Sequence, residues 1–131
     1  MARGPEAKIQ SRVIVYLKDR GWMVERMIGN ALQKGIPDLY VFHSQFGARW
    51  IDIKNPGRYN FTNAQKQKWP VWTQHGCGIW IITNDDKEQY DKLFAAPNWL
   101  DYWKDSWGDP FNQPTKLDIL KQAFLENDES T

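Results

Sequence analysis

The order of apolar and polar residues predicts that the first part of the chain forms one helix followed by three strands. Apolar side chains recur at helical spacing over residues 4–20, where Pro5 suits the first helical position. Residues 22–28, 38–44 and 49–55 alternate as half-buried strands do. A short turn separates the last two of these segments, so they are expected to pair as a hairpin.

The second part of the chain predicts a helix between the hairpin and a fourth strand. Thr62 and Gln65 have the spacing of a capping box, so a helix is expected to begin there, and Pro70 is expected to kink or loosen it. The continuous apolar run over residues 78–83 is typical of a strand buried on both faces. Because a helix separates the third and fourth strands, we expect them to be parallel within a mixed sheet.

Beyond the fourth strand the pattern predicts less regular structure. A helix is expected over about residues 85–95 and another over 115–126, with loops over 97–114. Aromatic residues make up 15% of the chain, with eight tryptophans. Such rings stack on nucleic-acid bases but more often fill cores and interfaces, so the core role is favoured. The tryptophan-rich segment 99–107 is nevertheless a candidate dimer or DNA surface.

Length and charge set the limits on what the chain can do. Its 131 residues fit one domain, residues 1–131, with a core of about 5–95 and a C-terminal extension of about 96–131. The net charge is +1, so binding to a polyanion needs a local basic patch. One cysteine and two distant histidines predict neither a disulfide framework nor a Cys/His metal site. With no membrane span or secretory signal in view, we expect a cytoplasmic protein that is not secreted.

The segment KGIPDLYVFHSQFGARWIDIKN, residues 34–55, places acids within predicted β-structure. Strand alternation directs Ile51 and Ile53 to the core and places Asp52 and Lys54 together on the other face. Asp38 opens the partner strand, so pairing of the hairpin brings its carboxylate near that of Asp52. Two such carboxylates repel each other unless a cation neutralises them, and Mg²⁺ takes oxygen ligands of this kind. A neighbouring lysine would stabilise charge during phosphodiester hydrolysis.

Polar residues of two helices are expected at the same edge of the sheet. Glu6 and Gln10 continue the apolar stripe of the first helix, and Gln65 lies in line with the tryptophans of the second. Each polar residue also has an ordinary local explanation. Glu6 suits a helix N-terminus, Gln65 suits a capping box, and Asp52 with Lys54 suits a solvated strand face. The combination, rather than any one residue, favours a site.

These residues resemble the motifs of the PD-(D/E)XK nuclease superfamily. The likeness is closest to its virus-type replication-repair nuclease (VRR-NUC) branch, over about residues 5–83. The motifs are an early-helix Glu6, GIPD ending at Asp38, DIK at 52–54 and Gln65 in the next helix. The resemblance implies an α/β fold with a restriction-endonuclease-like αβββαβ core and mixed sheet, followed by a helical and loop-like C-terminal extension. Asp52 departs from the branch, which more often has Glu there.

The resemblance also implies the role of each site residue. Asp38, Asp52 and the Ile53 carbonyl would bind Mg²⁺, or Mn²⁺ in its place, with Glu6 supporting the metal directly or through water. Lys54 would orient or activate the attacking water, and Gln65 would position Lys54 or the phosphate. Basic residues near the site are expected to hold DNA phosphates: Lys34, Arg58, Lys66 and Lys68.

Small members of the branch are similar to viral (phage) dimeric enzymes that cut branched DNA. The expected function is therefore a metal-dependent, structure-specific DNA endonuclease that acts as a homodimer on substrates such as Holliday junctions. A sequence-specific homing or restriction-like endonuclease is the alternative. A catalytically inactive DNA-binding protein is a third interpretation, less favoured because both acids and the lysine are present.

Overall fold

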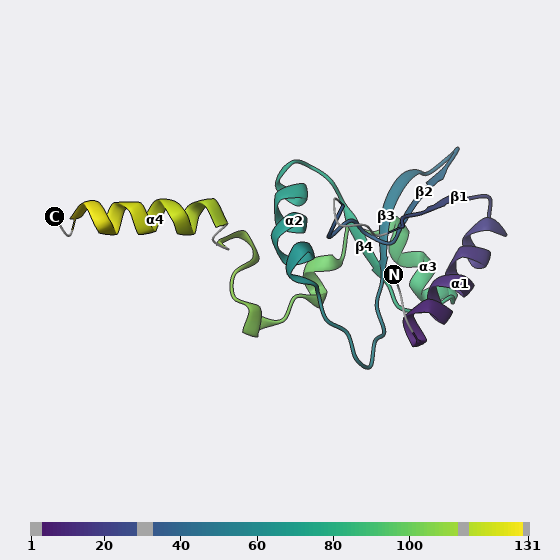
Figure 1. Ribbon diagram of the computed structural model, residues 1–131. Coiled ribbons are helices and arrows are strands. Elements are labelled where there is room, and N and C mark those ends of the chain that lie inside the picture. The colour runs from purple at the N-terminus through teal and green to yellow at the C-terminus, as the bar shows by residue number, and fades with distance from the viewer. Residues whose placement is uncertain (1–3, 29–32, 113–115, 130–131) are drawn as a thin grey trace.

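A computed structural model describes residues 4–28, 33–112 and 116–129 (Figure 1). The predicted order of helices and strands is confirmed. The main elements are α1 (Pro5–Lys18), β1 (Met23–Arg26), β2 (Leu39–His43), β3 (Gly47–Ile53), α2 (Asn63–Gln74), β4 (Ile79–Ile82) and α3 (Lys87–Asp91). Four short 3-10 helices follow α3: η1 (Lys92–Phe94), η2 (Trp99–Tyr102), η3 (Asp105–Trp107) and η4 (Pro110–Asn112). The last element is α4 (Lys116–Glu129).

The four strands form one mixed sheet in the order β1-β2-β3-β4. β1 pairs with β2 and β2 with β3 in antiparallel fashion, whereas β3 and β4 are parallel. Both the predicted hairpin and the predicted parallel crossover are therefore confirmed. In Figure 1 the sheet lies between α2 on one side and α1 with α3 on the other. The chain thus has three layers, and α2 is the crossover helix.

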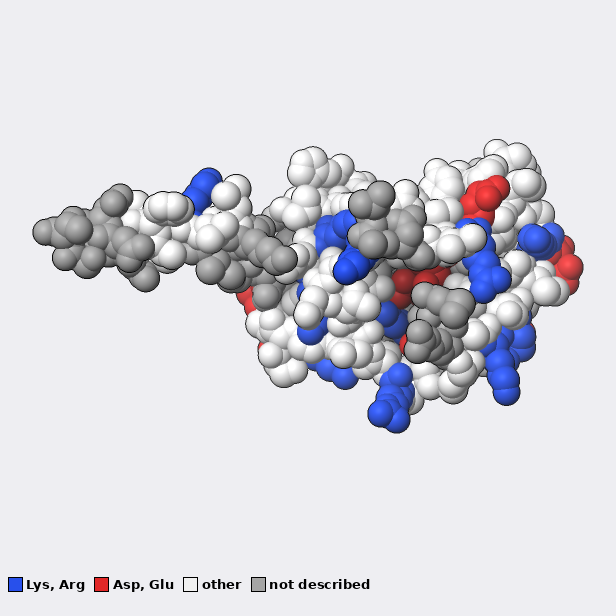
Figure 2. All heavy atoms as spheres, in the orientation of Figure 1, with Lys and Arg blue, Asp and Glu red and all other residues white. Residues whose placement is uncertain are grey.

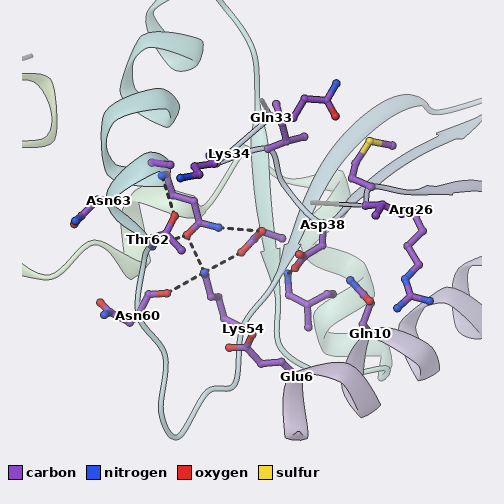
Figure 3. Close-up of a pocket in the computed structure, with 18 residues that line it drawn as sticks. Glu6, Gln10, Arg26, Gln33, Lys34, Asp38, Lys54, Asn60, Thr62 and Asn63 are labelled. Carbon is purple, nitrogen blue, oxygen red and sulfur yellow. Dashed lines mark hydrogen bonds and ion pairs between the residues drawn. The ribbon is translucent and has the colours of Figure 1, made fainter. Parts of the chain in front are cut away.

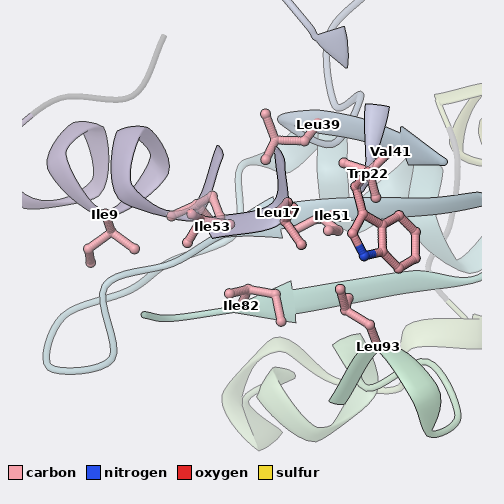
Figure 4. Packing of buried hydrophobic residues seen from close by; sticks show 10 residues of the cluster. Ile9, Leu17, Trp22, Leu39, Val41, Ile51, Ile53, Ile82 and Leu93 are labelled. Carbon is pink, nitrogen blue, oxygen red and sulfur yellow. The ribbon is translucent and has the colours of Figure 1, made fainter. Parts of the chain in front are cut away.

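The core between the sheet and α1 is mostly aliphatic, with Trp22 as its buried aromatic residue. The buried stripe of α1 (Ile9, Val13 and Leu17) packs against strand residues that point to the same face (Figure 4). Leu39 and Ile51 are paired neighbours in β2 and β3 and are both fully buried. This layer fixes α1 across the sheet, with Glu6 and Gln10 near one end.

The core on the α2 side is aromatic. Trp69 of α2 and Trp99 of η2 are buried beside Phe61, and the Trp69 and Trp99 rings meet edge to face. The Trp99 indole donates a hydrogen bond to Thr73 Oγ1 at 2.9 Å. The interpretation of the aromatic residues as core is thus confirmed for these rings. Trp99 cannot belong to a dimer or DNA surface, although Trp103 and Trp107 remain half-buried.

Two expectations from the sequence are corrected by the structure. Residues 97–114 were expected to be loops but include η2, η3 and η4, because their aromatic side chains pack onto the second core. α2 runs through Pro70 to Gln74 with Pro70 buried, and the expected kink or loosening at Pro70 stays a prediction. β4 was expected to be buried on both faces, but Trp80 is only half-buried and its indole donates to the Ala95 carbonyl oxygen.

The final helix is longer than predicted and stands apart from the other elements in Figure 1. Its apolar side chains Leu117, Leu120, Phe124 and Leu125 are 59%, 57%, 70% and 56% exposed. In the part of the chain that the structure describes, no helix has both the length and the apolar character needed to cross a bilayer.

Gly35, in the GIPD segment, locks the loop before Asp38 onto the start of α2. Its backbone has φ +83°, and a Cβ there would lie 2.9 Å from the Ala64 carbonyl carbon and oxygen. The Gly35 carbonyl accepts a hydrogen bond from the Trp69 indole at 2.7 Å. Only glycine allows both this backbone conformation and this approach.

Gly35→Ala is expected to lower the free energy of unfolding by about 3 kcal/mol, combining backbone strain with a clash against the helix. Gly76→Ala is the matched control, because Gly76 has φ +87° and a Cβ there would meet no atom within 4 Å. It should cost only about 1–2 kcal/mol of strain. Urea unfolding measures both, and equal losses would contradict the close approach.

Candidate active site

The hairpin places two carboxylates opposite each other at the end of the sheet. Leu39 pairs with Ile51, so Asp38 and Asp52 lie one step further along the same register. The Asp38 Oδ2 atom accepts a hydrogen bond from the Ile53 amide at 2.8 Å. The Asp38 carbonyl in turn accepts one from the Met27 amide, also at 2.8 Å. Asp38 is therefore fixed by both neighbouring strands, and the expected proximity to Asp52 is confirmed.

Asp52 and Lys54 are buried, with only 1% and 5% of their surfaces exposed. The alternative that they form a solvated strand face is therefore wrong. Lys54 Nζ lies 3.0 Å from Asp52 Oδ2, 2.9 Å from the Asn60 carbonyl oxygen and 3.0 Å from Gln65 Oε1 (Figure 3). An ammonium group has three N–H donors; two of them form the hydrogen bonds to Asn60 and Gln65, and the contact with Asp52 is an ion pair.

Gln65 serves both as a helix cap and as a site residue. Its Oε1 atom accepts hydrogen bonds from the Thr62 amide and from Lys54 Nζ, both at 3.0 Å. Its Nε2 group donates to Asp52 Oδ1 at 3.5 Å. The capping box predicted from the sequence is confirmed. The capping box fixes the side-chain amide of Gln65, which connects the start of α2 to the Asp52 carboxylate.

Burial makes Asp52 a strong proton acceptor. Burial raises the pKa of Asp52 to about 8, with a further contribution from the negative charge of Asp38, while Lys54 opposes the rise. Burial also raises the pKa of Asp38, against the lowering effect of its hydrogen bond from the Ile53 amide. Among the described residues, Asp52 Oδ2 receives no hydrogen bond, although it is in ion-pair contact with Lys54. The site therefore holds a buried carboxylate oxygen that faces a positive charge but receives no hydrogen bond from the described residues.

Glu6 approaches the same region from α1 but makes a different contact. Its Oε1 atom accepts a hydrogen bond from the Asn55 amide at 3.4 Å, just beyond Lys54 in the chain. Glu6 lines the pocket at its α1 side and is only partly buried. The predicted convergence of residues from α1, the hairpin and α2 is thus confirmed, with Glu6 at the rim.

This group of residues lines an open pocket of about 1140 Å³. Figure 2 shows acidic atoms in a hollow of this face with basic atoms around it. Lys34 lines the pocket, as predicted, whereas Arg58, Lys66 and Lys68 lie outside it. Lys66 instead covers the Trp107 ring, 4.5 Å from its centroid.

Three further residues of the pocket were not expected from the sequence. Arg26 ends β1, and Asn60 and Asn63 flank the capping residue of α2. The alternation of β1 is the only pattern that could have indicated Arg26, because it places that side chain on the same face as Val24. Asn60 acts through its backbone carbonyl, which any residue supplies, so the sequence carried no indication of it.

The available ligand atoms suit a hard divalent cation. The Asp38 and Asp52 carboxylates and the Ile53 carbonyl are all oxygen donors, as Mg²⁺ and Mn²⁺ prefer. Within the described ranges, no group of three or more His, Cys, Asp or Glu side chains could hold a metal without help. A cation here would therefore also bind water, a backbone carbonyl or a phosphate, as Mg²⁺ commonly does.

Comparison with known proteins bears on the fold. No protein-family model and no curated protein matches this sequence. A solved structure described as a VRR_NUC domain is similar, with a TM-score of 0.56 and 17% sequence identity. The likeness covers 70% of this chain and 96% of that one. The chain therefore has the fold of a VRR-NUC domain, and the α/β, restriction-endonuclease-like architecture expected from its motifs is confirmed.

Proposed function

We propose that this protein is a metal-dependent endodeoxyribonuclease that hydrolyses phosphodiester bonds in DNA. The observation that carries the proposal is the set of Asp38, Asp52, Lys54 and Gln65 at the floor of an open pocket. The raised pKa of Asp52 supports it, because uncompensated carboxylates are characteristic of sites that bind cations. The VRR-NUC fold adds independent support.

In this proposal Asp38, Asp52 and the Ile53 carbonyl would hold Mg²⁺, with Mn²⁺ as a substitute and Glu6 contributing directly or through water. The cation would supply Lewis acidity toward the phosphate and would lower the pKa of a bound water. Asp38 is already oriented by the Ile53 amide, which leaves its other oxygen directed toward the site. Asp52 would hold the cation as a carboxylate, with its proton lost to solvent.

Lys54 and Gln65 act on the water and the phosphate. Lys54 Nζ donates hydrogen bonds to the Asn60 carbonyl oxygen and to Gln65 Oε1, and it is in ion-pair contact with Asp52 Oδ2. Its third N–H would be available to the attacking water or to a phosphate oxygen. Gln65 and the Asn60 carbonyl keep the ammonium group in place meanwhile. Lys54 then stabilises the negative charge that develops on the phosphate.

We expect branched DNA, such as a Holliday junction, to be the preferred substrate and a homodimer to be the active form. The motif resemblance supports both expectations, and two symmetric cuts require two sites. Lys34 inside the pocket would hold a phosphate of the bound strand, and Arg58, Lys66 and Lys68 would contact DNA outside it. A sequence-specific endonuclease and an inactive DNA-binding protein are the alternatives.

Asp38→Asn and Lys54→Met should each lower the rate of DNA cleavage at least about a thousandfold, since each removes charge from the reacting centre. Gel assays on labelled DNA with Mg²⁺ measure the rate. Lys87→Met is the matched control, because Lys87 is exposed and pairs only with Asp91 on α3. Circular dichroism should show a folded chain for all three. Undiminished cleavage in either site variant would remove these residues from the mechanism.

The Asp52 carboxyl should titrate with a midpoint near pH 8 in the metal-free protein. Asp38→Asn should lower this midpoint, because the Asp38 charge contributes to the rise. Mg²⁺ should lower it too, since a cation and a proton compete for the carboxylate. Carboxyl ¹³C NMR measures the midpoint. The affinity for Mg²⁺ should fall about tenfold per pH unit below pH 8. A metal-free midpoint below 5 would contradict the raised pKa.

A panel of junction, flap, nicked and plain duplex DNA should show cleavage of the junction above the others, with Mg²⁺ or Mn²⁺ and not with EDTA. Cutting confined to one duplex sequence would favour the homing or restriction-like alternative. Binding without cleavage under all metal conditions would favour the inactive one. Light scattering of the free protein tests the dimer separately, and a monomer at assay concentration would contradict it.

A further inference from the structure

The α1 side of the pocket contains a side-chain amide that faces the solvent of the pocket. Gln10 is 4% exposed and lines the pocket beside Glu6. In the part of the chain that the structure describes, its side chain makes no hydrogen bond, and Asp52 Oδ2 is the one fully buried side-chain polar atom without a hydrogen-bond partner there. The small exposed part of Gln10 is therefore its amide group, which is open to a ligand in the pocket.

Arg26 lies on the same side of the pocket. It pairs with Leu39 across the β1–β2 ladder, so both side chains are on the α1 face of the sheet. Leu39 packs with Ile9 and Val13, the α1 residues on either side of Gln10. Figure 3 draws Arg26 and Gln10 together on the side of the pocket away from α2. Within the described residues, the Arg26 guanidinium has no ion pair or hydrogen bond.

This pair also lies close to the carboxylates of the site. The next residue after Arg26, Met27, donates its amide to the Asp38 carbonyl at 2.8 Å. Arg26 therefore directly precedes a residue that is hydrogen-bonded to Asp38. Among the described residues, neither Arg26 nor Gln10 forms a hydrogen bond or ion pair with Asp52, Lys54 or Gln65, and the two side chains line a separate wall of the same pocket.

We infer that Arg26 and Gln10 form a second phosphate-binding subsite, which holds a DNA phosphate next to the one that is cleaved. The identity of the ligand as DNA rests on the proposed function. A guanidinium group and an amide NH₂ are donors that match the non-bridging oxygens of a phosphodiester. The positive charge of Arg26 disfavours a second cation there and attracts an anion. On the opposite wall, Lys34 would hold the strand at its other side.

The test is the affinity of Arg26→Ala and Gln10→Leu for fluorescein-labelled junction DNA, by anisotropy in EDTA and in Ca²⁺. Arg26→Ala should weaken binding about tenfold and lower the salt slope by about one counterion. Gln10→Leu should weaken binding severalfold. Arg12→Ala is the matched control for charge, because Arg12 is on α1 but pairs with Asp85 outside the pocket. It should bind DNA as the wild type does.

Gln10→Leu should also keep the melting temperature of the wild type, since the Gln10 amide makes no hydrogen bond within the described residues. Gln89→Leu is the comparison, because the buried Gln89 amide accepts a hydrogen bond from the Thr83 amide and its loss should destabilise the fold. A lower melting temperature of Gln10→Leu with unchanged DNA affinity would give Gln10 a structural role and overturn the inference.

A scan of DNA in which single phosphates are replaced by neutral methylphosphonates locates the contact. The wild type should lose affinity at one position beside the cleaved bond, and Arg26→Ala should lose nothing further there. If Arg26→Ala and Gln10→Leu have the same DNA affinity as Arg12→Ala, the subsite is wrong. Cleavage of DNA by the wild type would still support the proposed nuclease function in that case. If the wild type never cleaves but both variants bind DNA more weakly, the nuclease function falls and the subsite stands. Absence of DNA binding by the wild type overturns both.

Discussion

The burial of Asp52 beside Lys54 is the constraint on which the rest of the site depends. Isolated charges are costly to remove from water, and a buried ion pair does not generally stabilise a fold over apolar residues of similar size. The two side chains must therefore be held by contacts from elsewhere in the chain. Lys54 is held by Gln65 in the first turn of α2 and by the Asn60 carbonyl in the loop before it. Asp38 of the partner strand is fixed beside the pair by the Ile53 amide. The pair has its place because all three segments converge.

This convergence explains features that are otherwise local. The capping box begins α2, and it also directs the Gln65 amide toward both Asp52 and Lys54. The Gly35 backbone lies against the first turn of α2, which sets the distance between that helix and the strand that begins after Asp38. Each element could vary independently in a protein without the site. Here a shift in any one of them would leave a buried charge unpaired.

Much of this was predictable from the sequence, and the remainder has identifiable physical causes. Strand alternation was sufficient to place Asp52 and Lys54 on one face, and helical spacing was sufficient to direct Glu6 and Gln65 inward. Burial of that strand face was not predictable, because it depends on α2 and the aromatic core beyond the sheet. The 3-10 helices after residue 97 follow from tertiary packing of rings and not from local propensity. Arg26 lines the pocket because the register of β1 with β2 pairs it with Leu39. The alternation of residues within one strand does not determine how that strand pairs with its neighbour.

The aromatic core has a second consequence for Lys54. Its ammonium group lies 5.1 Å from the centroid of Phe61 and 5.8 Å from that of Trp69, in addition to its contacts with Asn60 and Gln65. Ring faces attract a cation, so these contacts persist whether Asp52 is protonated, ionised or bound to a metal. The two rings and the Asn60 carbonyl thus hold the lysine without taking part in the proposed chemistry. Asp52 can change its charge state while the position of the lysine stays fixed, as the proposed exchange of a proton for a cation requires.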